Sequence, residues 1–323
     1  MSSVRAEGGD RPVAHEPVLA EAVAGLLEPV LVDGGSFVDA TIGRGGHARR
    51  LLDAAPRSWL IGVDRDPDAL EACRADLSSF GDRARLVRDD FKNLSAVLER
   101  LGVEEVRGVL LDLGVSSPQL DESHRGFSFR ADGPLDMRMD PDQRLSADTI
   151  VNTYAQDDLA RIIRLYGEER FAKRVARAIV AARPIRSTEH LAEVVTAAIP
   201  AATRRTGGHP ARRTFQAIRI EVNAELSALE EVLPQAVSVL ATGGRVVVIS
   251  YHSLEDRIVK RFFAEESKGC VCPPDFPICA CDAQATLRVL TSRPVRATAE
   301  EAASNPRSTA GKLRAAEKIG KVA

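Results

Sequence analysis

The chain of 323 residues, 44% of them hydrophobic, is long enough to bury a sizeable core in one large domain or two smaller ones. The formal net charge of −2 excludes a protein that is basic along its whole length, and no apolar run reaches the length of a membrane span. Residues 1–11 are polar and lack the apolar region of a signal peptide, so we expect a disordered lead over residues 1–12 and a cytoplasmic protein.

The first half of the chain alternates between helical and strand patterns. Apolar residues three and four positions apart predict helices at 18–27, 48–52, 68–77 and 94–101. Short apolar runs predict strands at 37–39, 59–64, 84–87 and 109–113. This order of strands and helices predicts a parallel sheet with helices on both faces.

The alternation stops after the fourth expected strand. Residues 114–141 are rich in Gly, Pro, Asp and Arg, which predicts a loop, and the pattern from residue 146 to about residue 233 is helical. Within this region we expect Thr188 to cap a helix. We also expect the apolar positions from Phe215 to Leu233 to form one long amphipathic helix.

The last part of the chain returns to the sheet. A buried strand is expected at 243–250, a helix at 254–263, and closing strands near 287–290 and 310–316. We therefore expect an α/β domain made of residues 13–140 and 234–323, interrupted by an all-helical insert over residues 141–233.

Positive charge gathers in the expected insert. Between Val151 and Ile220 the chain has 13 arginines and lysines against 6 acids, a local net charge of +7. Three of these, Arg170, Arg174 and Arg177, form a ridge along one predicted helix. A basic segment within an acidic chain is the expected footprint for a polyanion, although a solvated arginine-rich surface without a partner is the alternative.

Residues 43–48 read Gly-Arg-Gly-Gly-His-Ala and match the pattern G-x-G-x-x-G/A between a strand and a helix. In such a loop a Cβ would collide with the ligand, and glycine adopts positive φ at little cost. The helix start favours an anionic group. A tight turn without a ligand remains the alternative interpretation.

In an open parallel sheet, ligands bind beyond the carboxyl ends of the strands. Asp64 ends the second expected strand, where an acid bonds a ribose hydroxyl in nucleotide sites, and Phe91 follows the third, where its ring is placed to stack on adenine. A helix N-cap and an ordinary core aromatic are the respective alternatives. The pattern fits a ligand that contains adenosine, either NAD or S-adenosylmethionine. The segment 251–253, Tyr-His-Ser, also follows a strand.

Residues 112–119, Asp-Leu-Gly-Val-Ser-Ser-Pro-Gln, follow the fourth expected strand. N-methyltransferases that act on exocyclic amines often carry a short polar motif with proline at this place. The lone pair of such an amine is delocalised into the base, so acceptors that bond the amine hydrogens prepare it for attack on a methyl group. Ser116, Ser117 and the carbonyls near Pro118 are therefore candidate catalytic groups, with a structural turn as the alternative.

Long motifs in this chain resemble the bacterial RsmH/MraW family of methyltransferases. They are residues 15–19, 39–47, 111–120, 125–129, 133–140, 166–173, 213–217, 252–260 and 305–308. The resemblance implies an α/β, class I (Rossmann-like) S-adenosylmethionine-dependent methyltransferase sheet with an inserted all-helical domain that faces RNA. The implied activity is methyl transfer to N4 of a cytidine in 16S ribosomal RNA, at the decoding centre of the small subunit.

The same resemblance implies which residues contact S-adenosylmethionine. They are Gly45, Gly46, His47, Asp64, Phe91, Asp112 and Gln119. Folded RNA hides N4, so Phe127 and Phe129 are candidates to stack on a flipped base, with burial in the core as the alternative. Asp136, Arg138 and His252 are polar candidates at the pocket rim, although a structural role is the more common one for such a histidine. A monomer and a homodimer both remain open.

Four of the five cysteines form a cluster, Cys270, Cys272, Cys279 and Cys281. Zinc binding is a candidate role, although one intervening residue is tighter than the usual spacing. Reduced thiols in a loop are the alternative, and Cys73 is expected to be a small buried hydrophobe.

Two other functions use some of the same features. A nicotinamide-dependent oxidoreductase would share the glycine loop, and a non-catalytic RNA-binding protein would share the basic segment. The former predicts binding of a nicotinamide cofactor, and the latter predicts salt-sensitive RNA affinity without turnover. The Ser-Ser-Pro segment and the long motifs disfavour both.

Overall fold

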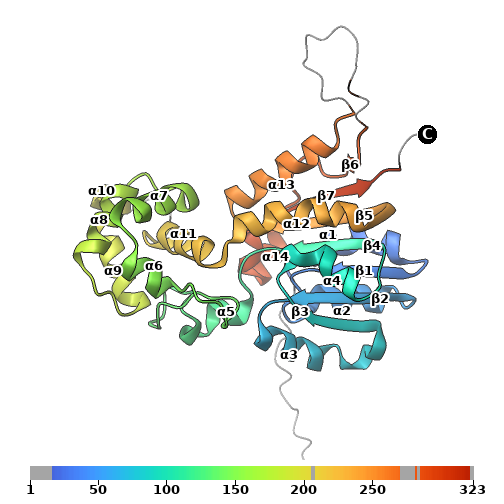
Figure 1. Cartoon of the computed structure of the whole chain (residues 1–323), viewed down its shortest axis with the longest axis horizontal. Helices are drawn as coiled ribbons and strands as arrows, with labels where there is room; N and C mark the ends of the chain where they lie inside the picture. The colour runs from blue at the N-terminus through green and yellow to red at the C-terminus, as the bar shows by residue number, and fades with distance from the viewer. Residues whose placement is uncertain (1–16, 205–207, 270–280, 282–283, 321–323) are drawn as a thin grey trace, which may run out of the picture.

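The structure is a computed structural model that describes residues 17–204, 208–269, 281 and 284–320. The expected disordered lead over residues 1–12 lies outside these residues. In Figure 1 an α/β part lies on the right and a group of helices on the left. No helix in the described part of the chain is both long enough and apolar enough to cross a bilayer.

A seven-stranded sheet forms the body of the α/β part, in the order β3-β2-β1-β4-β5-β7-β6. The first five strands run parallel, whereas β7 is antiparallel to both β5 and β6. The strands are β1 Gly35–Asp39, β2 Ser58–Asp64, β3 Ala84–Arg88, β4 Val106–Asp112, β5 Leu240–Ser250, β6 Leu287–Val289 and β7 Lys312–Lys318. The expected α/β class is confirmed, and each expected strand is found.

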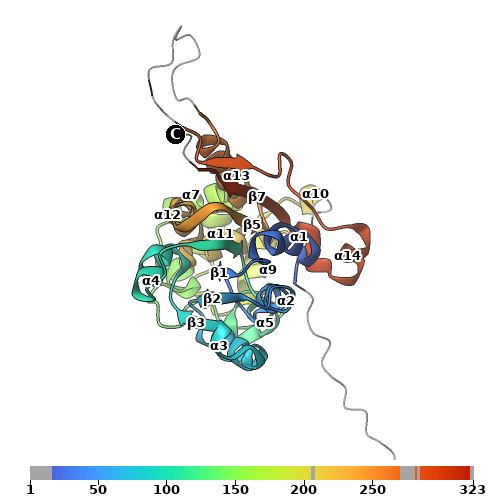
Figure 2. The ribbon, with the colours of Figure 1, turned by 90° about the vertical axis from the view of Figure 1, so that its right-hand side faces the viewer.

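Helices cover both faces of this sheet, as Figure 2 shows with α1 and α2 on one side and α4 and α12 on the other. Alternate strand residues point to opposite faces, so Phe37 packs in one core and its neighbour Val38 in the other. The first core includes α1 Ala20–Leu31, α2 Gly46–Ala54 and α3 Pro67–Asp76. The second includes α4 Leu94–Arg100, α12 Glu225–Val239 and α13 Ser253–Glu266. Burial on both faces explains why the central strands β1, β2, β4 and β5 read as apolar runs.

The helical part has a core of its own. Its helices are α6 Ala147–Thr153, α7 Gln156–Gly167, α8 Ala172–Ala181, α9 Thr188–Ala198, α10 Ala201–Arg204 and α11 Arg212–Asn223. The side chains of Phe127, Leu135, Met137 and Met139 from the preceding loop also pack in this core. The cap of α9 corrects one expectation, because Ser187, not Thr188, accepts the hydrogen bond from the backbone N–H of His190.

The expected single helix from Phe215 to Leu233 is wrong, because α11 ends at Asn223 and α12 begins at Glu225. Ala224 between them is left-handed, with φ of 49°. Asn223 is buried at the break, where its side chain donates to Met137 O at 2.7 Å and accepts from Met139 N at 2.9 Å. Because α12 packs on the sheet, we propose that the insert ends at Asn223 and not at residue 233.

The structure also contains short elements that the sequence patterns did not predict. Within the expected loop 114–141, residues fold into α5 Ser117–Asp121 and the 3-10 turn η3 Ser123–Arg125. Near the C-terminus, α14 Ala299–Ser304 and η4 Pro306–Ala310 precede β7. The turns η1 Ser78–Arg83 and η2 Phe91–Asn93 flank β3.

Candidate active site

A cavity of about 1340 Å³ opens beyond the carboxyl ends of β1, β2, β4 and β5. Its lining includes the glycine loop, the strand-end aspartates and the segment that follows β4. On the opposite side it reaches Phe127, Phe129 and Met139 and residues of α11. The cavity therefore lies between the sheet and the insert, which is where a parallel α/β sheet binds its ligands.

The glycine loop turns from β1 into α2 at the edge of this cavity. Gly43 and Gly45 have φ of 50° and 78°, which glycine adopts without strain. A Cβ on Gly45 would stand 2.9 Å from the Cys73 Sγ, and one on Gly46 would stand 3.1 Å from Pro17. The expectation that a Cβ here would meet the ligand is therefore incomplete, since it would first meet α3 and the N-terminal segment. Cys73 is buried, as expected for a small hydrophobe.

His47 projects from the start of α2 and lines the cavity. Its side chain is 6% exposed, and neither ring nitrogen has a hydrogen-bond partner among the described residues. Its Nε2 lies 3.6 Å from Asp112 Oδ2. Buried polar atoms normally have hydrogen-bond partners. The two ring nitrogens of His47 are therefore suited to bond a polar group of a ligand bound in the cavity.

Three aspartates from neighbouring strand ends, Asp39, Asp64 and Asp112, face the same cavity. Burial raises the pKa of Asp39 to about 7, against the nearby His47, which lowers it. Burial also raises the pKa of Asp64, whose Oδ2 accepts a hydrogen bond from Gly43 N at 2.9 Å. A cluster of carboxylates favours a cationic ligand, such as one that carries a sulfonium and an ammonium group.

Tyr251 follows β5 and positions Asp112. Its hydroxyl donates to Asp112 Oδ1 at 2.8 Å, and the backbone N–H of Asp112 donates to Thr41 Oγ1 at 2.6 Å. Burial and the Asp112 carboxylate raise the pKa of Tyr251. Sequence patterns placed Tyr251 at a strand end, but they gave no signal for the pairing with Asp112 or for the part played by Thr41.

Ser116 and Gln119 form a capping box at the start of α5. Ser116 Oγ accepts from Gln119 N at 3.5 Å, and Gln119 Oε1 accepts from Ser116 N at 3.0 Å. The Gln119 side chain also donates to Asp66 Oδ2 at 2.7 Å, so both ends of its amide are engaged within the protein. Ser116, Pro118 and Gln119 line the cavity, and Ser117 is the first residue of α5.

Phe91 begins η2, lines the cavity and packs against the core beneath α4 and α12, so its stacking on adenine stays a prediction. Phe127 is 6% exposed and belongs to the insert core. Phe129 is partly exposed, stacks on His209 with ring centroids 4.6 Å apart, and meets Phe215 edge-on. An aromatic wall therefore borders the insert side of the cavity.

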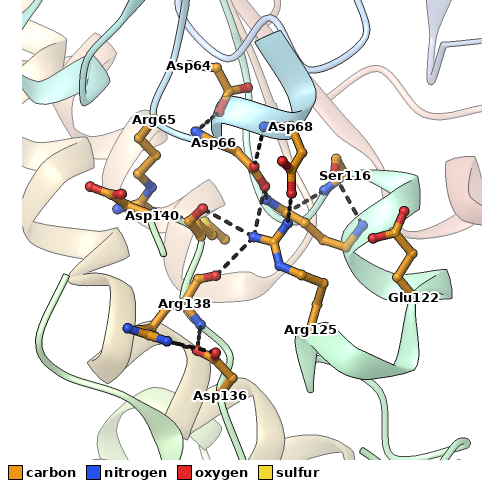
Figure 3. A network of polar contacts seen from close by, with 12 residues as sticks. Asp64, Arg65, Asp66, Asp68, Ser116, Glu122, Arg125, Asp136, Arg138 and Asp140 are labelled. Carbon is orange, nitrogen blue, oxygen red and sulfur yellow. Dashed lines mark hydrogen bonds and ion pairs between the residues drawn. The ribbon is translucent and has the colours of Figure 1, made fainter. Parts of the chain in front are cut away.

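Arg125 connects Asp66, which follows β2, to the loop around Arg138, as Figure 3 shows. Its Nη2 lies 2.9 Å from Asp66 Oδ2 and donates to the carbonyl oxygens of Arg138 and Met139 at 3.1 and 3.3 Å. Arg138 pairs with Asp136 at 2.6 Å, and neither of these two residues is among those that line the cavity. The pair thus orders the loop and does not form the expected rim.

The residues His252 and Glu255 begin α13 and form a second capping box within the cavity wall. Facing them, Arg219 of α11 holds both oxygens of Glu225 at 2.8 Å. Glu225, His252 and Glu255 bring one nitrogen and two oxygen atoms within 4.8 Å of one another. Of this group only His252 was expected at the pocket, and Glu225 reaches it from α12, a different part of the chain.

The cysteine cluster falls largely outside the structure's described residues. Of its four members only Cys281 is described, and it is partly exposed. The candidate zinc role of Cys270, Cys272, Cys279 and Cys281 therefore stays a prediction.

The chain matches the MraW methylase family over residues 12–319. It is 52% identical over 310 residues to ribosomal RNA small subunit methyltransferase H of Heliobacterium modesticaldum, covering 94% of this chain and 98% of that one. The protein of the same name from Thermobifida fusca is 52% identical over 322 residues, or 98% and 97% of the two chains. Among solved structures, that of a protein from Clostridium thermocellum named as a putative rRNA-methylase has a TM-score of 0.45 and 13% identity, covering 94% of this chain and 98% of that one. The matched span contains every cavity residue discussed above, and the chain belongs to the MraW methylase family.

Proposed function

We propose that the protein transfers a methyl group from S-adenosylmethionine to the exocyclic N4 of a cytidine in 16S ribosomal RNA, at the decoding centre of the small subunit. The observation that carries this proposal is the continuity of one cavity from the glycine loop to the aromatic wall of the insert. Cofactor and target base would meet within it. The names of the relatives from Heliobacterium modesticaldum and Thermobifida fusca support ribosomal RNA of the small subunit as the substrate.

The glycine-loop end of the cavity is the proposed cofactor site. Its residues are Gly45, Gly46, His47, Asp64, Phe91, Asp112 and Gln119, all of which line the cavity. When bound, S-adenosylmethionine supplies an electrophilic methyl group on a sulfonium. Asp112 would stabilise positive charge, Asp64 would bond a ribose hydroxyl as expected from its place at the end of β2, and His47 offers ring nitrogens without partners among the described residues. Gln119 acts by holding Asp66 and Ser116 in place.

The segment after β4 is the proposed site of methyl transfer. Ser116, Ser117 and Pro118 follow Asp112 closely in the chain, and the capping box fixes Ser116 against α5. Oxygen acceptors in this segment would hold an N4 hydrogen and direct the lone pair toward the methyl group. The protonated product amine is acidic, so no strong base is needed before transfer.

The insert is the proposed RNA-facing part. Phe129, partly exposed beside His209, is the better candidate to stack on a flipped cytosine, because Phe127 is buried. On α8 and just before it, Arg170, Arg174 and Arg177 are exposed, as phosphate contacts require. Action on ribosomal RNA also supports the expected cytoplasmic location.

The direct test measures transfer of radiolabelled methyl from S-adenosylmethionine to small ribosomal subunits that lack the modification, followed by nucleoside analysis. We expect label in N4-methylcytidine, and none on subunits that already carry the modification. Label in another nucleoside would contradict the assignment of the amine. No label on subunits or free 16S RNA, with cofactor binding intact, would contradict the substrate.

A further inference from the structure

A buried polar group at the insert end of the cavity is not used by the proposed cofactor site. Arg219 and Glu225 come from the junction of α11 and α12, and His252 and Glu255 come from the start of α13. All four line the cavity. Because β5 lies beside β4 in the sheet, α13 starts next to the segment where methyl transfer is proposed. The group is therefore placed to contact the reacting base.

The neutral His252 ring carries its proton on Nε2. Its Nδ1 accepts a hydrogen bond from Glu255 N at 3.3 Å, which leaves no proton on Nδ1. Burial, reinforced by the charge of Arg219, lowers the pKa of His252 to about 3, so the ring is not doubly protonated at neutral pH. The side chain is only 8% exposed, yet Nε2 has no hydrogen-bond partner among the described residues. This N–H is a fixed donor that needs an acceptor.

Burial raises the pKa of Glu255 to about 7, and its ionised form supplies an acceptor beside this donor. Its Oε2 accepts from the backbone N–H groups of Tyr251 and His252, at 2.8 and 3.2 Å. Its Oε1 lies 3.2 Å from His252 Nε2, although the two do not meet with hydrogen-bond geometry. The Nε2–H donor of His252 and the Oε1 acceptor of Glu255 thus lie side by side in the cavity wall. Each side chain is held at the start of α13 by its other polar atom, Nδ1 of His252 and Oε2 of Glu255.

A metal ion is the other ligand that an imidazole and two carboxylates suggest. Two contacts oppose it here. Arg219 donates to both oxygens of Glu225 at 2.8 Å, which already neutralises that carboxylate. The protonated Nε2 of His252 also lacks the lone pair that a metal would need, unless the cap of α13 breaks.

We propose that His252 and Glu255 read the target base, with Glu255 Oε1 accepting from N4–H of cytosine and His252 Nε2–H donating to N3. This inference rests on the proposed function and names the specificity-determining residues of the same site. Cytosine presents an amino donor next to a ring acceptor on its Watson–Crick edge. Uracil presents the reverse, a carbonyl acceptor next to an N–H donor. Its carbonyl would face the Glu255 acceptor, and its N–H would face the His252 donor. The pair therefore selects cytosine and orients its amine.

The test combines a protein variant with a base analogue. In His252→Asn, the asparagine still caps the helix but lacks the Nε2–H. The substrates are small subunits reconstituted with cytidine or 3-deazacytidine at the methylated position, since the analogue lacks the N3 acceptor. For the wild type we expect kcat/KM to fall roughly tenfold to hundredfold on the analogue. For His252→Asn we expect a similar fall already on cytidine, and little further loss on the analogue.

The matched control is His124→Asn, an exposed histidine outside the cavity, which should behave like the wild type. Binding of S-adenosylhomocysteine, measured by calorimetry, should be unchanged in every variant. Should His252→Asn fail to fold, Glu255→Gln keeps the capping box while replacing the acceptor by an amide, and we expect it to lose transfer with cofactor binding intact.

Three results would overturn the proposal. One is a full analogue penalty in His252→Asn, which would mean that His252 does not contact N3. Another is unchanged transfer to cytidine by that variant. A third is loss of wild-type transfer on chelation with recovery on adding one divalent ion, which would favour a metal. Failure of the wild type to methylate unmodified subunits would instead contradict the proposed function itself.

Discussion

At the scale of single residues, Asp39 makes the stability of the protein depend on pH. Burial raises its pKa from 3.8 to about 7, so ionisation is harder in the folded chain than in the unfolded one. Its contribution to stability is therefore complete below pH 4 and is lost as the pH rises to about 7. The side chain in Asp39→Asn cannot ionise, so the variant does not lose this contribution to stability as the pH rises. The unfolding free energy of the variant, relative to wild type, should rise between pH 4 and pH 7 by up to about 4 kcal/mol.

Urea denaturation of both proteins across this range provides the measurement, and titration of the groups that do not interact with Asp39 cancels in the difference. The amide can still accept the hydrogen bond that Thr41 N donates to Asp39 Oδ1 at 3.3 Å. A difference that stays constant with pH would show that Asp39 is ionised throughout.

A variant of Tyr251 tests how far cofactor binding depends on a firmly oriented Asp112 carboxylate. Tyr251→Phe removes the 2.8 Å hydrogen bond to Asp112 and leaves a partly buried carboxylate less firmly oriented. We expect affinity for S-adenosylhomocysteine to fall about tenfold, as loss of one hydrogen bond to a charged group predicts. The matched control is Tyr154→Phe, which loses a 3.1 Å bond to Glu221 within the insert and should bind the cofactor product normally. Equal affinities of both variants would contradict this role.

At the scale of elements, the start of α2 depends on Gly45. Gly45→Ala would place a methyl group 2.9 Å from Cys73 Sγ and hold alanine at φ of 78°. We expect a loss of stability of about 2–4 kcal/mol, the sum of backbone strain and overpacking. Gly102→Ala is the control for strain alone, since Gly102 has φ of 69° with open space around it, and should lose only about 1–2 kcal/mol.

Thermal and urea unfolding of the two variants would separate the two effects. Adding Cys73→Ala to Gly45→Ala should recover the part due to collision, after correction for the cavity that Cys73→Ala makes by itself. Equal losses in Gly45→Ala and Gly102→Ala would mean that α3 shifts readily and that the loop is not packed as described.

The elements also show what sequence patterns can and cannot predict. Apolar runs predicted the central strands β1, β2, β4 and β5, because burial on both faces leaves a strong local signal. The helix break at Ala224 was not predicted, because alanine carries no turn signal. Its left-handed conformation is held by contacts of Asn223 with residues distant in the chain. Likewise, Ser187 and Thr188 are both residue types that cap helices, and the cap observed is Ser187, the type that ranks higher.

At the scale of the whole molecule, one part of the candidate site could be predicted from the sequence and another part could not. The glycine loop and the strand-end aspartates were predictable, because parallel strands bring their carboxyl ends to one edge. The pairing of Tyr251 with Asp112 and the meeting of Glu225 with His252 depend on how the insert and the sheet close around the cavity. No local pattern carries that information, so the family motifs pointed to the cofactor site better than to the base site.

The arginine ridge of the insert makes a prediction for the whole molecule on its substrate. Replacing Arg170, Arg174 and Arg177 by glutamine should weaken binding to small subunits, because exposed arginines on the proposed RNA face would neutralise phosphates. The slope of log Kd against log salt should become less steep by up to about 2–3, since each lost phosphate contact removes about 0.7–0.9. Cofactor binding should not change, because none of the three residues lines the cavity.

The control carries the same change of charge on the α/β part, with the exposed residues Arg57, Arg74 and Arg85 replaced by glutamine. Its net charge equals that of the ridge variant, so a general electrostatic effect would alter both slopes equally. A change confined to the ridge variant supports an RNA face on the insert. Equal slopes would place the ribosomal contact elsewhere and leave the ridge as a solvated helix surface, because charge position and not total charge distinguishes the two variants.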